Sequence, residues 1–190
     1  NLAAGQLAGL QIDPPENSSV DFELKISATS TENNGSSATT NATLKVTVDA
    51  VADKPNLDVG TSTDQDDAAE VSGAENSAIT LDITSSLVDT DGSETLSVEI
   101  SGIPTGATLS LQDGSSVTVT NGTATISDIV NSDGTTTTVA QQLSGLNITP
   151  ATDDDTDFSL TVSATSTDTD PDTSVTSTAT ATGTIDVNVS

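Results

Sequence analysis

Residues 79–100 read ITLDITSSLVDTDGSETLSVEI, and this stretch decides how the rest of the chain is interpreted. Apolar and polar residues alternate over 79–88 and again over 96–100. Alternation with a period of two is typical of strands that bury one face. The residues between them, DTDGSE at 89–94, have the composition of a tight turn. The stretch therefore predicts two strands joined by an acidic loop.

The acidic loop is a candidate site for a hard cation. Asp89, Asp91 and Glu94 place three carboxylates close together, and Gly92 lets the backbone turn back sharply. Ca²⁺ takes about six to eight oxygen ligands, which such a loop can help to supply. The spacing differs from that of an EF-hand loop. The alternative is a polar β-turn without an ion, because Asp and Gly are common in turns.

The charge of the chain limits its partners. Its 190 residues include 29 acidic and only 3 basic side chains, for a formal net charge of −26. We expect no nucleic-acid partner, because binding phosphates requires a basic surface. We expect no membrane insertion either, because no run approaches the roughly 20 apolar residues of a membrane span. A cation is the natural partner, since it would reduce the repulsion among the acidic groups.

The residue types that are missing argue against catalysis. The chain has no His, Cys, Tyr, Trp or Met. A Ser-His or Cys-His nucleophile is therefore impossible, and so are disulfides and thiol chemistry. A pair of carboxylates could still act as acid and base, but every acidic cluster lies in an expected turn. We expect that the protein is not an enzyme.

Alternation with a period of two recurs along the chain, and Thr and Val, which favour strands, fill much of the remainder. The further alternating segments are Phe22–Ile26, Leu44–Val48, Leu109–Leu111, Val117–Val119, Phe158–Val162 and Ile185–Val189. No helical periodicity of useful length is visible. The sequence predicts an all-β fold with a small core of Leu, Ile and Val.

An internal repeat sets the domain organisation. Three segments recur, two at an offset of 136 residues and the last at 141, so the second copy has five extra residues (141 − 136) between its last two strands. The pairs are Gln6–Leu10 (QLAGL) with Gln142–Leu146 (QLSGL), Ser27–Thr31 (SATST) with the identical Ser163–Thr167, and Leu44–Val48 (LKVTV) with Ile185–Val189 (IDVNV). The two copies predict a tandem arrangement of related modules.

The repeat predicts three parts of the chain. Residues 1–50 are interpreted as the C-terminal part of one repeat, residues 51–56 as a linker, and residues 57–190 as a complete repeat. Turn signals about every ten residues favour Ig-like (cadherin-like) β-sandwiches in tandem. Two long strands in residues 1–50 cannot close a sandwich alone. Either a preceding segment or another chain supplies the missing strands.

An Ig-like arrangement would bring acidic loops together at the joint between the repeats. We take 78–88 as the second strand and 158–167 as the sixth, so that the loops after both lie at the entry pole of the complete repeat. The linker enters at that pole, and the end of the first repeat faces it. The predicted Ca²⁺ ligands are Asp89, Asp91, Glu94, Asp49, Asp53, Asp168, Asp170, Asp21 and Asp13, with Asp172 and Glu16 nearby. Glu75 either binds an ion at the opposite pole or simply begins a strand.

Several segments resemble a known family. Residues 89–98 (DTDGSETLSV), 101–110 (SGIPTGATLS) and 48–55 (VDAVADKP) closely resemble the Ig-like or cadherin-like extender repeats of giant bacterial RTX adhesins, which are exported by type I secretion. The resemblance covers nearly the whole chain. It is weakest over residues 117–141, where a Thr-, Asp- and Gly-rich segment replaces an expected strand, so the strand register there stays open.

The resemblance implies a function. It implies tandem repeats that form an extracellular stalk on the bacterial cell surface, with adjacent repeats of the same protein as partners and Ca²⁺ stiffening the joints. The acidic turn of the family maps onto Asp89, Asp91 and Glu94, and its junction onto Asp49 and Asp53.

Two alternatives remain. One is a ligand-binding adhesin module, which would need a cleft lined by aromatic residues. The other is a fibre subunit that self-associates by strand addition.

Overall fold

The computed structural model describes residues 2, 4–60 and 68–190, and their regular secondary structure is nearly all strand, with 47% strand and 4% helix. The all-β prediction is confirmed. The elements are η1 (Ala4–Gln6), β1 (Phe22–Thr31), β2 (Ser37–Val46), β3 (Asn56–Asp58), β4 (Ala69–Gly73), β5 (Ile79–Thr80), β6 (Thr84–Ser86), β7 (Glu94–Ser101), β8 (Thr108–Ser110), β9 (Ser116–Val117), β10 (Thr123–Ser127), β11 (Ile129–Val130), β12 (Thr136–Thr137), α1 (Val139–Leu143), β13 (Asn147–Thr149), β14 (Phe158–Thr169) and β15 (Thr176–Val189). No helix among these described residues is long and apolar enough to cross a membrane.

The chain forms two compact units. Unit 1 comprises Asn1–Val51 together with the loop Thr169–Thr176, and unit 2 comprises Ala52–Asp168 and Ser177–Ser190. The boundary at Val51 falls at the start of the linker predicted over 51–56. The loop Thr169–Thr176, which is grouped with unit 1, connects β14 to β15. The repeat comparison places the five extra residues of the second copy in this same connection.

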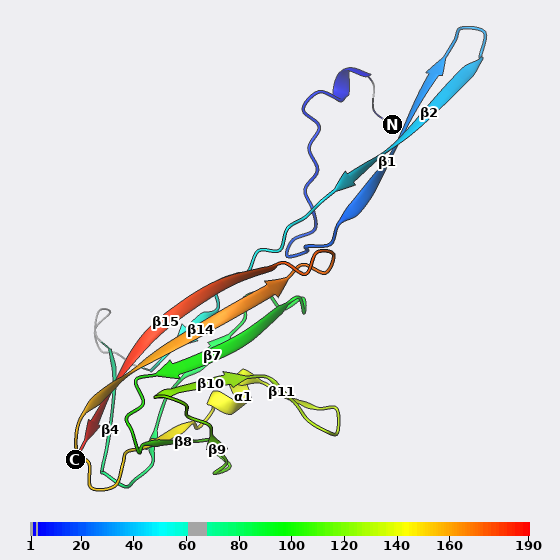
Figure 1. Cartoon of the computed structure of the whole chain (residues 1–190). Coiled ribbons are helices and arrows are strands. Elements are labelled where there is room, and N and C mark those ends of the chain that lie inside the picture. Colours follow the sequence, from blue (N-terminus) through cyan, green and yellow to red (C-terminus); the bar gives the residue numbers. More distant parts are fainter. Residues whose placement is uncertain (1, 3, 61–67) are drawn as a thin grey trace. The chain divides into compact units, whose positions relative to one another are not determined.

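Unit 2 is a sandwich-like pair of sheets. One sheet has the order β10-β7-β14-β15-β4 and the other the order β5-β13-β8-β9. Figure 1 shows β7, β14 and β15 running side by side. In the larger sheet β14 is antiparallel to β7, with Val162 opposite Ile100, and β4 is parallel to β15. Ile100 and Val162 belong to the same buried core as Leu109 and Ile148 of the smaller sheet.

The alternating pattern of the sequence produces this core. On β14, Leu160, Val162 and Ala164 are fully buried, while the intervening Ser163 and Thr165 lie on the outer face. Each fully buried large aliphatic side chain contributes about 1.5–3 kcal/mol relative to exposure. The hydrophobic inner face therefore fixes which side of β14 faces the second sheet.

The structure differs from the single strand predicted over 78–88. Two short strands lie there instead, since β5 pairs with β13 in one sheet and β6 pairs with β3 in another. Leu81 and Ile83 lie in or beside the break and remain buried, and Leu81 N–H donates to Leu146 O at 2.8 Å. The alternation marked buried side chains correctly, but it could not show that the chain crosses from one sheet to another.

A short helix also escaped prediction. α1 begins at the end of residues 117–141, where the resemblance is weakest, and Thr138 caps it. The Thr138 side chain accepts from Gln141 N–H, and the Gln141 side chain accepts from Thr138 N–H, which together form a capping box. Val139 and Leu143 on α1 are buried. A single turn of helix is too short to create a recognisable helical periodicity.

The strands of unit 1 form one long antiparallel pair. β1 and β2 pair over ten residues each, from Phe22 opposite Val46 to Thr31 opposite Ser37, and Figure 1 shows them as a two-stranded ribbon. Among the described residues, neither strand pairs with a third strand. Most side chains of this pair are exposed.

Candidate metal centre

The acidic loop of residues 89–94 shapes itself through its own side chains. Asp89 Oδ1 accepts from Asp91 N–H at 2.9 Å, and Asp91 Oδ1 accepts from Ser93 N–H at 2.8 Å. The bonds from Ser93, first that of its N–H, lower the pKa of the Asp91 carboxyl. Gly92 has φ +99°, a conformation that side-chain-bearing residues rarely adopt. The loop thereby delivers Glu94 to the start of β7.

Two carboxylates face each other inside unit 2. Glu94 on β7 lies directly opposite Asp168 on β14, on the inner face of the sheet. The two residues are 7% and 4% exposed, and the neighbouring Asp89 is 5% exposed. Like charges directly opposite each other destabilise a strand pair. This arrangement therefore favours a counter-charge between the strands.

One oxygen of each facing carboxylate has no hydrogen-bond partner among the described residues. Glu94 Oε1 accepts from Asp53 N–H at 2.7 Å, but Glu94 Oε2 and Asp168 Oδ1 are buried and unpaired. An unsatisfied buried polar atom costs about 1–3 kcal/mol, and more when it is charged. Both oxygens are acceptors only, so a cation or a proton is what the pair lacks.

The electrostatics of the pair point the same way. Burial raises the pKa of the Glu94 carboxyl, and the carboxylates of Asp53, Asp89 and Asp168 raise it further. The hydrogen bond from Asp53 N–H opposes these effects. A bound cation would reverse the influence of the neighbours, because it would favour the ionised form.

The start of unit 2 is tied to the same region. Ala52 N–H donates to Ser177 Oγ at 3.1 Å, and the hydroxyl of Ser166 donates to the main-chain oxygen of Asp53. Ser166 is fully buried two residues before Asp168, on the same face of β14. The site thus joins the linker to both β7 and β14.

The geometry is that of an open pair and not of a closed cage. Within residues 2, 4–60 and 68–190, no three acidic side chains are already gathered closely enough to hold a metal ion. Ca²⁺ also accepts main-chain carbonyls and water as ligands and tolerates irregular coordination. The oxygen-only donor set of Glu94, Asp168 and Asp89 fits a hard cation and offers nothing to a thiophilic or imidazole-binding metal.

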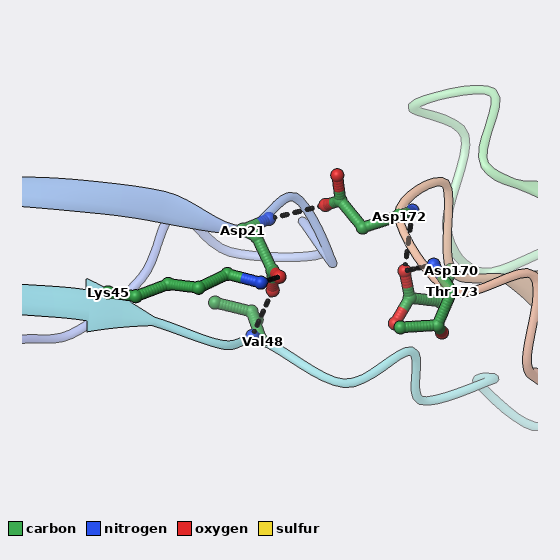
Figure 2. Close-up of polar contacts among 6 residues, drawn as sticks. All are labelled: Asp21, Lys45, Val48, Asp170, Asp172 and Thr173. Atoms are coloured by element: carbon green, nitrogen blue, oxygen red, sulfur yellow. Dashed lines mark hydrogen bonds and ion pairs between the residues drawn. The ribbon is translucent and has the colours of Figure 1, made fainter.

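A second acidic group lies in unit 1, and here the charges already have partners. Lys45 Nζ lies 2.9 Å from Asp21 Oδ2, and Asp21 Oδ1 accepts from Val48 N–H at 3.0 Å. Asp172 Oδ2 accepts from Asp21 N–H at 2.8 Å, as Figure 2 shows. The contact with Lys45 lowers the pKa of Asp21 and raises that of Lys45. Lys45 is the cation of this group.

Asp170 belongs to the same group and caps its own loop. Its Oδ1 accepts from Asp172 N–H at 2.7 Å and from Thr173 N–H at 3.0 Å (Figure 2). A hydrogen bond from the Thr173 side chain is the main cause of a lowered pKa for the Asp170 carboxyl, and the two N–H bonds lower this pKa further. Asp21 and Asp170, both predicted as Ca²⁺ ligands, are therefore already stabilised by protein donors.

The remaining predicted ligands lie outside the buried pair. Asp13, Asp49 and Asp91 are exposed. Glu75 lies in the turn between β4 and β5, where its N–H donates to Ser190 O at 3.2 Å. Ser177 lies at the start of the long strand β15 and Ser190 follows its end, so Glu75 lies roughly 40 Å along the sheet from the linker. Its role as a ligand at the opposite pole stays a prediction.

Sequence reasoning missed the serines of the site. Ser166 and Ser177 hold the linker, yet both lie in Ser- and Thr-rich strands without a distinguishing motif. One signal was available. Ser166 follows the apolar row Leu160, Val162 and Ala164 on β14, and Ser30 occupies the same position in the first copy.

No protein-family model matches the chain, and no curated protein matches it at a significant level. The fold and the acidic pair therefore carry the functional argument.

Proposed function

We propose that the protein is a structural extender module of a bacterial cell-surface adhesin, with Ca²⁺ stiffening the connection between its units. The observation that carries the proposal is the facing pair Glu94 and Asp168, buried and with one unpaired oxygen each. The most economical occupant of the space between them is a divalent cation, because it satisfies both oxygens and cancels their repulsion.

The position of the pair explains how an ion would stiffen the protein. The chain passes from one unit to the other at Val51–Ala52, Asp168–Thr169 and Thr176–Ser177. Asp168 is itself at one of these points, and Ala52 and Ser177 at the other two are hydrogen-bonded to each other. An ion held by Glu94, Asp168 and the adjoining Asp53 would therefore limit the motion of the chain at all three points where it passes between the units.

The remaining features agree with a spacer role. The two copies of the repeat and the all-β fold suit modules that are strung in series. We take the sandwiches to be Ig-like, the adjacent repeats of the same protein to be the partners, and the location to be the extracellular surface. These assignments rest on the resemblance of residues 89–98, 101–110 and 48–55 to adhesin extender repeats.

Thermal unfolding of the whole chain tests the proposal, with excess Ca²⁺, with Mg²⁺ and with EGTA. Specific binding predicts a large rise in Tm with Ca²⁺ alone, since an ion that binds only the folded state stabilises it by mass action. Small-angle scattering should show a narrower range of shapes with Ca²⁺ than with EGTA. Equal, small shifts with either ion would reduce the effect to charge screening and remove the basis of the proposal.

A further inference from the structure

The apolar residues that precede β1 are exposed, although their counterparts in the second copy are buried. Leu7, Leu10 and Ile12 are 59%, 62% and 47% exposed. Their counterparts at the offset of 136 residues are 1%, 0% and 0% exposed, namely Leu143, Leu146 and Ile148. Even the helical turn recurs, because η1 lies where α1 lies in the second copy.

The same contrast holds on the paired strands. Ile26 on β1 is 48% exposed and Leu44 on β2 is 51% exposed, whereas Val162 and Ile185 at the equivalent positions are fully buried. Ile26 and Leu44 lie on one face of the strand pair, and the counterparts of Leu7, Leu10 and Ile12 pack in the same core as Val162 and Ile185. We call these five exposed apolar residues the open face of unit 1. Two strands with such a face are marginal in water without further partners.

The polar positions on this face are copied too. Ser30 corresponds to Ser166, which is fully buried in unit 2, and Glu32 corresponds to Asp168. The row Leu24, Ile26, Ala28 and Ser30 on β1 matches the buried row Leu160, Val162, Ala164 and Ser166 on β14. A strand face exposed to solvent does not require such an apolar row. The open face of unit 1 therefore has the pattern of a sandwich interior.

Unit 2 shows what covers the equivalent face. There β7 pairs with the edge of β14 that faces away from β15, and β4 pairs with the edge of β15 that faces away from β14. The sheet that contains β5, β8 and β9 supplies the opposing side of the core. All of these covering strands lie within residues 57–136.

We propose that the open face of unit 1 is the docking surface for a segment built like residues 57–136 of this same chain, delivered from the amino-terminal side of Asn1. Its strands equivalent to β7 and β4 would pair along β1 and β2, and its second sheet would cover Leu10, Ile26 and Leu44. The inference does not depend on Ca²⁺ binding.

A second copy of the chain is a poorer occupant. Its own β4, β7 and opposing sheet already cover β14 and β15, and Leu160, Val162 and Ile185 there are fully buried. If β1 and β2 took the place of β14 and β15 against those covering strands, Leu160, Val162 and Ile185 would become exposed, and no net apolar burial would result. In the second copy the covering segment runs directly into α1, so a segment that precedes Asn1 has the shortest connection.

The test uses the whole chain, with and without a copy of its residues 57–136 fused directly before Asn1. This junction reproduces the spacing of the second copy, in which residue 136 precedes the counterpart of Asn1. Amide hydrogen exchange is followed in β1 and β2, with β14 and β15 as internal references. We expect protection of β1 and β2 to rise by at least about 100-fold on fusion, because cooperative burial replaces local opening.

Two neighbouring variants in the fused chain control for orientation. Ile26→Asp places a charge on the open face and should abolish the gain in protection. Ser27→Asp places the same charge on the opposite face of β1 and should leave the gain intact.

Three results would overturn the proposal. The first is unchanged exchange in β1 and β2 of the fused chain while β14 and β15 remain protected. The second is full protection of β1 and β2 in the unfused monomer. The third is a dimer of the unfused chain in sedimentation that Ile26→Asp dissociates, which would make a second copy the occupant.

Discussion

The strand pairs β1–β2 and β14–β15 are two copies of one sequence pattern in two environments. They share SATST, an Asp that precedes a Phe, and a cross-strand Thr pair with Oγ1 atoms 2.9 Å apart in unit 1 and 3.0 Å apart in unit 2. In both copies that Asp accepts a hydrogen bond from a Val near the end of the second strand. Only the second copy lies in a five-stranded sheet with a core behind it. The pairing of two strands is thus encoded locally, whereas their burial depends on further elements of the chain, including the distant strands β7 and β4.

The largest difference between the copies should appear in the core. Leu160→Ala should destabilise unit 2 by about 2–5 kcal/mol, because it leaves a cavity at a fully buried position. The equivalent Leu24→Ala in unit 1 should change stability by only about 0.5 kcal/mol. Urea unfolding checks the first value, and hydrogen exchange in β1 checks the second. Similar losses at the two positions would mean that the two environments are alike.

Two glycines with the same backbone conformation provide a smaller contrast. Gly102 has φ +85° and a Cβ there would lie 2.5 Å from Ser159 O, whereas Gly35 has φ +87° and open space around it. Gly102→Ala should cost about 2–4 kcal/mol, since strain and a backbone clash add. Gly35→Ala should cost only about 1 kcal/mol from the left-handed conformation. A Gly102→Ala protein as stable as Gly35→Ala would refute the close approach after β7.

The acidic groups of the two units should respond to pH in opposite directions. Glu94 has a raised pKa, so its contribution to stability is present at low pH and is lost as pH rises through its folded-state pKa. Asp21 has a lowered pKa, so its contribution is present at higher pH and is lost as pH falls through its folded-state pKa.

Difference measurements isolate these contributions from the other carboxylates. In EGTA, Glu94→Gln should gain stability relative to the wild type as pH rises from about 4 to 7, since it removes a charge that burial disfavours. Asp21→Asn should lose stability relative to the wild type over the same range. Parallel pH profiles for the two variants would contradict the assigned electrostatics.

The smallest expected effect concerns the ion pair of unit 1. Lys45 is 63% exposed, so Lys45→Met should destabilise unit 1 only slightly, and the difference should shrink in high salt. Hydrogen exchange around Asp21 and Val48 at low and high ionic strength measures it. A large loss that is independent of salt would show that Lys45 does more than neutralise Asp21.

Much of the fold could be predicted from the alternation of apolar residues. The inner faces of β7, β14 and β15 follow directly from it, because burial on one face requires a period of two. The crossing at Leu81–Ile83 could not be predicted, because buried residues look the same whichever sheet they join. α1 escaped as well, since the only local sign of a five-residue helix is the capping pair Thr138 and Gln141.

The sequence allowed us to choose the acidic residues of the candidate site, but not to tell which of their carboxylates are paired with protein donors. Asp89, Glu94, Asp168 and Asp53 could be chosen because acidic turns follow expected strands. The sequence could not separate this cluster from the one at Asp21, Asp170 and Asp172. What separates them is which N–H and ammonium groups reach each carboxylate, and this depends on Lys45 and on loop conformations that have no sequence signature.

The most direct test of the central claim compares the wild type with Glu94→Gln in Ca²⁺ and in EGTA. A matched control is Asp113→Asn, which removes an exposed charge from another turn and keeps an acceptor for Ser115 N–H. If the facing pair binds Ca²⁺, Glu94→Gln unfolds at a higher temperature than the wild type in EGTA and at a lower temperature in Ca²⁺, while Asp113→Asn follows the wild type in both. If Glu94→Gln keeps the full Ca²⁺-dependent shift of the wild type, the ion binds elsewhere and the account is wrong.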